Sequence, residues 1–246
     1  MIANLFNTIF FEPLYNALVF ISSVLPGHNL GLAIIILTLI VKLILFPLYH
    51  RVATTQKKLK TLEPELKKIK DEHRDNRQRQ AEKIMELYRQ HGLNPLSGLW
   101  IMLIQIPILL ALFWVFRDSV TLRPELLYSF VKPPATLNSY LGFIDLTQAS
   151  YLLAILTGAA QWLQMQLSIP PLPASDPQTA KGFSQDLAKS MNIQARYVLP
   201  AMMLVFSLGL PGAIALYWLV GSLFTIAHEL LVKRQTKALL GAETIN

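Results

Sequence analysis

The sequence contains no cysteine in 246 residues, and only 15% of its residues are charged. The lack of cysteine excludes disulfides, cysteine-ligated zinc, iron–sulfur clusters and a cysteine nucleophile from this chain. Hydrophobic residues make up 53% of the chain, and the mean hydropathy is +0.41. Few charges and many apolar residues predict an all-α polytopic membrane protein and not a soluble domain.

Catalytic and nucleotide-binding motifs are missing as well. The sequence has no GxxxxGK[ST] phosphate-binding loop, no HExxH motif and no pair of aspartates inside its apolar stretches. Ser222 and His228 are the nearest approach to a nucleophile and base, and they lie near the end of one apolar stretch. We therefore expect no enzymatic activity, no metal site and no cofactor.

One charge interrupts the apolar stretch of residues 29–49, and it is Lys42. In a helix of about 20 residues this lysine lies roughly 18 Å from one end and roughly 10 Å from the other. A cation at that depth costs on the order of 3 kcal/mol unless water or a partner reaches it. No other apolar stretch has Asp or Glu in its middle, and Glu229 is the nearest to one. Two interpretations follow: Lys42 snorkels to the headgroups, or it serves a water-filled groove.

Polar side chains recur on one face of two other apolar stretches, 149–169 and 211–232, and one glutamine interrupts the stretch 94–116. Such stripes usually hold helices together by hydrogen bonds. Because Lys42 has no countercharge, we expect instead a hydrophilic groove with a positive charge. Its predicted lining is Lys42, Gln105, Thr157, Gln161, Gln164, Trp218, Ser222 and Thr225.

The distribution of charge divides the chain into segments. Residues 50–93 contain more than half of the 22 Lys and Arg residues, which places them in the cytoplasm by the positive-inside rule. The N-terminus then lies outside and the C-terminus inside. We expect an interfacial amphipathic helix (1–28), transmembrane helices at 29–49, 94–116, 149–169, 197–210 and 211–232, a cytoplasmic basic helical hairpin (50–93), an extracytoplasmic connection (117–148), a cytoplasmic loop (170–196) and a short cytoplasmic tail (233–246).

Two of these segments allow alternatives. Residues 1–26 could form a sixth transmembrane helix, although Asn4, Glu12 and Pro13 favour an amphipathic helix in the interface. The hairpin has a narrow apolar seam that includes Leu62 and Leu87, and its basic surface could meet anionic lipid or ribosomal RNA.

Residues 94–116 begin NPLSGLWIMLIQIPILLALFW and resemble the signature NPLxGCxPxLIQxPIFxALY of the YidC family of membrane protein insertases. Three further stretches resemble family segments in the same order: LAIIILTLIVKLILFPL, LEPELKKI, and LPAMMLVFSLGLPGAIALYWLVGSLFTI. The resemblance is to a short form without a large extracytoplasmic domain. Lys42 stands where the family usually has Arg, and Gly221-Ser222 stands where Ser-Asn is frequent.

The resemblance implies a five-helix core in the bacterial cell membrane that acts as an insertase and chaperone. Its groove would accept the hydrophilic part of a nascent membrane protein and release the apolar part into lipid, without nucleotide hydrolysis. The implied partners are nascent clients, the ribosome and the lipid bilayer, with a Sec-type translocon as a further candidate and no DNA. A small-solute channel or secondary transporter is the alternative, although the sequence shows no inverted repeat.

Overall fold

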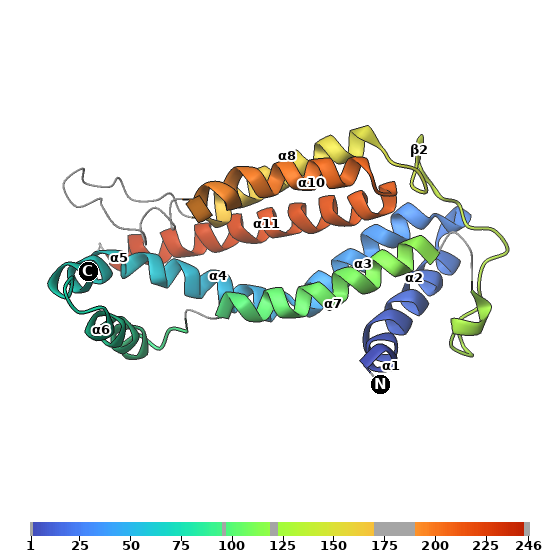
Figure 1. Ribbon diagram of the computed structural model, residues 1–246. Helices are drawn as coiled ribbons and strands as arrows, with labels where there is room; N and C mark the ends of the chain where they lie inside the picture. Colours follow the sequence, from blue (N-terminus) through green and yellow to red (C-terminus); the bar gives the residue numbers. More distant parts are fainter. Residues whose placement is uncertain (1, 95–96, 119–122, 170–189, 244–246) are drawn as a thin grey trace.

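The computed structural model describes residues 2–94, 97–118, 123–169 and 190–243. Most of this chain is helical, and the longest helices run roughly side by side in an elongated bundle (Figure 1). A helical hairpin extends from one end of the bundle, and a small β-hairpin lies at the other end (Figure 1). The fold is therefore the all-α architecture expected from the composition, apart from this β-hairpin.

The elements follow one another with few interruptions. The N-terminal half contains α1 (Ile2–Phe6), the π-helical turn η1 (Asn7–Phe11), α2 (Glu12–Val24), η2 (Pro26–His28), α3 (Leu30–Ile44), α4 (Phe46–Thr61), α5 (Glu63–Glu72) and α6 (Arg77–Gln90). The rest contains α7 (Ser97–Asp118), η3 (Pro124–Leu126), β1 (Tyr140–Leu141), β2 (Ile144–Asp145), α8 (Tyr151–Ser168), η4 (Gln194–Val198), α10 (Leu199–Leu208) and α11 (Gly212–Glu243).

The bundle is organised around α11, which packs against α8 on one side and α3 on the other. A glycine allows α8 and α10 to approach closely, because a Cβ added at Gly158 would lie 2.9 Å from the Cβ of Leu204. Small residues at helix contacts are typical of membrane proteins, where close backbone approach replaces the hydrophobic effect. The helices α8, α10 and α11 therefore form one tightly packed unit (Figure 1).

The predicted transmembrane helix 29–49 is not one continuous helix. The chain bends by 58° between α3 and α4, at Leu45. Pro47 explains the bend, because proline has no N–H to donate to the carbonyl of Leu43 and disfavours helical geometry at the residue before it. The sequence-based division took these residues as one span and did not use this proline.

Membrane-crossing capacity can be judged from length and composition. Among the described residues, two helical stretches could each cross a bilayer, Asn4–Val24 and Gly212–Lys233, and the bent pair of α3 and the start of α4 would make a third. Leu103–Phe116 of α7 is a shorter apolar helix. The five-span topology therefore stays a prediction.

The N-terminal helix, α1 to α2, packs against α3 and α7. It buries Tyr15 and also Asn16, whose amide donates to Leu126 O at 2.9 Å and accepts from Tyr128 N at 2.7 Å. Its outward side includes the exposed Leu5 and Val24. This apolar outer surface and the length of Asn4–Val24 agree both with the predicted interfacial position and with a membrane crossing.

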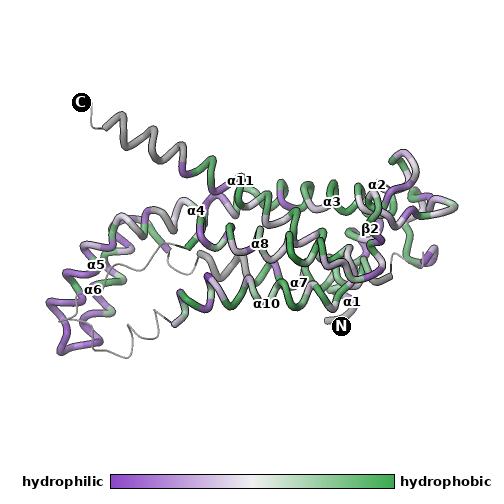
Figure 2. Tube along the Cα trace, turned by 90° about the horizontal axis from the view of Figure 1, so that it is seen from above, coloured by the Kyte–Doolittle hydropathy of each residue, from purple (hydrophilic) through white to green (hydrophobic). Residues whose placement is uncertain are grey.

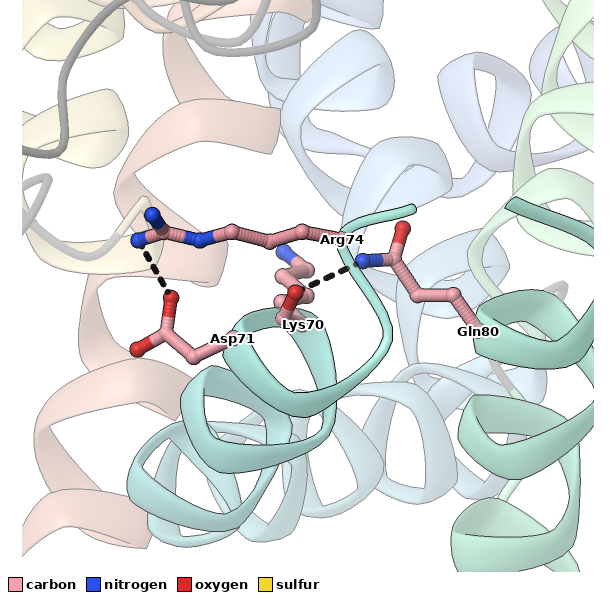
Figure 3. Close-up of polar contacts among 4 residues, drawn as sticks. All are labelled: Lys70, Asp71, Arg74 and Gln80. Carbon is pink, nitrogen blue, oxygen red and sulfur yellow. Dashed lines mark hydrogen bonds and ion pairs between the residues drawn. The ribbon is translucent and has the colours of Figure 1, made fainter. Parts of the chain in front are cut away.

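The helices α5 and α6 lie within the predicted hairpin range 50–93, whose first residues belong to α4, and they form the most hydrophilic part of the described chain (Figure 2). The turn between the two helices ends at Asn76, which caps α6 by accepting a hydrogen bond from Arg79 N at 2.9 Å. Across the turn Gln80 donates to the carbonyl of Lys70 at 2.9 Å (Figure 3). An ion pair between Arg74 and Asp71 adds to this end (Figure 3).

Two other segments differ from their predicted boundaries. The expected cytoplasmic tail from residue 233 continues α11 as far as Glu243, because the sequence there has no proline and ends its helical pattern only at Gly241-Ala242. Of the predicted loop 170–196, residues 170–189 lie outside the described residues, and residues 190–193 are helical and lead into η4.

The β-hairpin in the connection 117–148 was not predicted, because its strands have only two residues each. The residues around it bind the starts of two helices, α3 and α11. Leu30 N donates to Asn138 O at 2.8 Å, and Gly212 N donates to Gln148 O at 2.8 Å. These bonds satisfy N–H groups that a helix start leaves without intrahelical partners.

The close approach at Gly158 gives a test of the packed unit. We expect Gly158→Ala to lower the free energy of unfolding by about 1–3 kcal/mol, because the added methyl group must displace Leu204. Thermal unfolding of the purified protein in detergent measures this change. Gly209→Ala is the matched control, since a Cβ there would lie 3.8 Å from Phe206 O, an ordinary contact. Equal stability of the two variants would contradict the close packing.

Candidate functional site

Lys42 is half-buried near the end of α3, and its ammonium is held by a tyrosine. The Nζ atom donates a hydrogen bond to the hydroxyl of Tyr49 at 3.3 Å. The same ammonium lies 4.7 Å from the centroid of the Tyr49 ring, within the range of a cation–π interaction. Lys42 and Tyr49 meet because the bend at Leu45 turns the first turns of α4 toward α3.

The contact continues as a chain of hydrogen bonds across four helices. The Tyr49 hydroxyl donates to Gln105 Oε1 on α7 at 2.6 Å. Gln105 Nε2 then donates to the hydroxyl of Tyr217 on α11 at 2.8 Å. We call these four side chains, Lys42, Tyr49, Gln105 and Tyr217, the Lys42 cluster. Two of the predicted groove residues therefore meet, through a tyrosine that the prediction had not included.

No carboxylate among the described residues lies within ion-pair distance of Lys42; the ion pairs described are Arg74–Asp71 and Lys83–Glu86, both in the hairpin. The α11 backbone closes the other side of the lysine. A Cβ added at Gly221 would lie 3.3 Å from Lys42 Cε and 3.8 Å from Nζ. The described neighbours of the cation are therefore a neutral tyrosine and the glycine of a helix, and none of them is a countercharge.

The polar stripe of α8 separates into different environments. Thr157 is completely buried and donates to the Ala215 carbonyl of α11 at 3.0 Å, so it joins two helices. Gln161 is half-buried and accepts a hydrogen bond from Ser222 Oγ at 2.9 Å. Gln164 is half-buried one turn further along. For Thr157 the structure shows the interhelical hydrogen bond, which was the alternative to a groove lining.

In the described part of the chain, no hydrogen bond joins the remaining predicted residues to the Lys42 cluster. Thr225 donates to the carbonyl of Gly221 within α11 at 2.9 Å. Trp218 lines an apolar cavity of about 130 Å³ between α7 and α11, together with Tyr217 and side chains such as Leu109 and Phe113. Lys42 is not among the residues that line this cavity. The helical periodicity had placed Trp218 with Ser222, but its ring turns toward α7.

Two histidines form a second polar contact that sequence reasoning missed. His50 Nδ1 lies 3.3 Å from His228 Nε2, and the ring of Phe46 stacks on His50 and meets His228 edge-on. This contact joins α4 to α11, and His50 directly follows Tyr49 of the Lys42 cluster. Among the described residues no group of three His, Asp or Glu could hold a metal ion.

Comparison with known proteins identifies the fold that carries this cluster. The family model described as "60Kd inner membrane protein" matches residues 20–239. The chain belongs to the 60Kd inner membrane protein family. The matched range contains all four members of the Lys42 cluster and both histidines.

Curated relatives within the 60Kd inner membrane protein family carry a functional name. The chain is 35% identical over 223 residues to a protein of Pasteurella multocida named "Membrane protein insertase YidC". Proteins with the same name from Haemophilus influenzae and Histophilus somni are 34% and 33% identical over the same length. Each alignment covers 91% of this chain but 36% of the relative, so the chain spans about a third of their length.

The structure predicts an uneven water accessibility along α8. We expect a membrane-impermeant maleimide added from the cytoplasmic side to react with Gln161→Cys and Gln164→Cys but not with Thr157→Cys. Thiolate forms only where water reaches, so reactivity reports hydration. Leu163→Cys, exposed on another face of the same helix, is the control for lipid exposure. Rapid labelling at 157 would contradict the packed interface, and equally slow labelling at all four positions would mean that this stripe is dry.

Proposed function

We propose that this chain is a membrane protein insertase that receives the hydrophilic part of a nascent membrane protein beside Lys42. The observation that carries the proposal is an ammonium in the last turn of the apolar helix α3, with a neutral hydrogen-bond partner and no carboxylate within reach among the described residues. Membership of the 60Kd inner membrane protein family and the name shared by its curated relatives support it.

The physical difficulty of insertion is the transfer of a polar segment across hydrocarbon. Backbone groups of that segment lose water without gaining partners, at several kcal/mol for each unsatisfied group. A hydrated groove that ends beside Lys42 would shorten the distance over which this loss occurs. An acidic side chain of the client would be attracted to the ammonium, by about 4 kcal/mol at 4 Å and an effective dielectric constant of 20.

The apolar part of the client provides the driving force. Once the hydrophilic segment occupies the groove, the following apolar segment can move into lipid beside the exposed apolar surfaces of the bundle. Such surfaces include Leu103 and Leu110 of α7 and Val205 of α10. This partition needs no nucleotide, and in this mechanism the protein has no catalytic residue.

The proposed setting is a bacterial inner membrane, with five spans, the N-terminus outside and the C-terminus in the cytoplasm. The basic hairpin α5–α6 would then face the cytoplasm, where it could contact the ribosome or anionic lipid. Nascent membrane proteins are the clients, and a Sec-type translocon is a candidate partner. A small-solute channel or transporter is the alternative function, and flux of small solutes in liposomes distinguishes it.

The charge of Lys42 is the first test of this proposal. We expect Lys42→Arg to retain insertion of a single-span client with an acidic N-terminal tail into reconstituted vesicles. Lys42→Ala and Lys42→Glu should slow it roughly tenfold or more, because a loss of about 1.4 kcal/mol of attraction is already a factor of ten. Lys132→Glu, which changes an exposed lysine of the connection 117–148, is the matched control. Normal insertion by Lys42→Glu would favour a snorkelling lysine.

Orientation is the second test, and the absence of cysteine makes it direct. We expect Gln78→Cys in the hairpin to react with an impermeant maleimide only from the cytoplasmic side, and Thr136→Cys only from outside. Both side chains are exposed, so slow labelling is not expected from burial. Labelling of Gln78→Cys from outside would reverse the proposed topology.

A further inference from the structure

Tyr49 occupies the position beside the Lys42 ammonium that an acidic client residue would need. We propose that Tyr49 is an internal ligand of Lys42 that an incoming carboxylate must displace, and that it thereby sets which clients the protein accepts. The inference rests on the proposed insertase function and concerns a residue outside the polar stripes.

The geometry of the contact is that of a neutral substitute for a carboxylate. The Tyr49 hydroxyl has committed its proton to Gln105 Oε1, at 2.6 Å, so its lone pairs are available to the ammonium at 3.3 Å. The ring adds its negative face, 4.7 Å from Nζ. Tyr49 therefore supplies both a hydrogen-bond acceptor and diffuse negative charge, without the full charge of an acid.

The bend between α3 and α4 is what makes this contact. On a straight helix Tyr49 would lie about 10.5 Å along the axis from Lys42, two turns away. The 58° bend brings the first turns of α4 back toward the ammonium. Pro47, which explains the bend, therefore also determines the ligand of Lys42.

Gly221 limits the other positions that Lys42 can take. The end of the lysine chain lies close to this glycine, and an added Cβ would be only 3.3 Å from Cε. The glycine therefore leaves the space that the end of the lysine chain occupies, and the polar partner of the ammonium in this position is Tyr49. A client carboxylate reaches the ammonium by exchanging with the tyrosine hydroxyl.

Displacement of this kind discriminates between clients. A tail with several acidic residues competes well for the ammonium, whereas a tail with one or none competes poorly. When a binding-competent state is only fractionally populated, the apparent affinity falls by that fraction. Removal of Tyr49 should therefore help weakly acidic clients more than strongly acidic ones.

The first measurement needs no client. Intact protein in vesicles of neutral lipid is treated with succinimidyl acetate, and acetylation of Lys42 is followed by mass spectrometry. We expect Tyr49→Leu to raise the rate of Lys42 acetylation roughly tenfold. This is the increase expected if the fraction of Lys42 ammonium groups that are not bound by Tyr49 grows from about a tenth to nearly all. Tyr49→Phe keeps the ring and loses the hydroxyl, so its acetylation rate should lie between those of the wild type and Tyr49→Leu. Tyr197→Leu, an exposed tyrosine of η4, is the matched control and should not change the rate.

The second measurement compares insertion of clients whose tails carry none, one or three acidic residues. Tyr49→Leu should reduce the ratio between the three-acid and one-acid clients, whereas Tyr49→Phe should reduce it less. Unchanged acetylation and an unchanged ratio in both variants, at wild-type thermal stability, would overturn the role of Tyr49. If Lys42→Ala inserts all clients normally while Tyr49→Leu still unmasks Lys42, the proposed role of Lys42 in insertion fails and the contact stands. If the wild-type protein inserts no client while Tyr49→Leu still unmasks Lys42, the insertase proposal itself fails.

Discussion

The cost of placing an ammonium in an apolar helix constrains the centre of this protein. Lys42 has no carboxylate partner among the described residues, so neutral groups must replace part of its hydration. Tyr49 does so directly, and Gln105 and Tyr217 orient it through consecutive hydrogen bonds. Because these residues come from four helices, the solvation of one cation couples α3, α4, α7 and α11.

The sequence was enough to predict that a polar centre forms around Lys42, but it was not enough to predict all of the residues that belong to this centre. The lack of a countercharge follows from residue positions alone, and the single glutamine of α7 belongs to the cluster. The depth of Lys42 in the membrane stays a prediction. Tyr49 was missed because the stretch 29–49 was treated as one straight helix. Pro47 was the available signal, since a proline within an apolar helix predicts a bend, but its direction depends on tertiary packing.

Helical periodicity also could not separate groove residues from residues that join helices. Thr157 and Gln161 lie on one face of α8 by spacing, yet Thr157 is completely buried against Ala215 and Gln161 is only half-buried. One face of α8 therefore passes from packed protein at Thr157 to a less buried environment at Gln161. The small β-hairpin escaped prediction for a different reason, because two-residue strands show no alternation of polar and apolar residues.

Moving α11 away from α8 would break different interactions than moving it away from α4 and α7. Against α8 the helix is joined by the buried Thr157, and α8 is in turn packed on Leu204 of α10 at Gly158. Opening that unit would leave cavities and an unsatisfied buried hydroxyl. Against α4 and α7 the described polar contacts are those of the Lys42 cluster and the histidine pair, and water can replace neutral hydrogen-bond partners at small cost. In the proposed mechanism, a path for a hydrophilic segment therefore forms more readily on the Lys42 side of α11 than at the packed contact of Thr157 with Ala215.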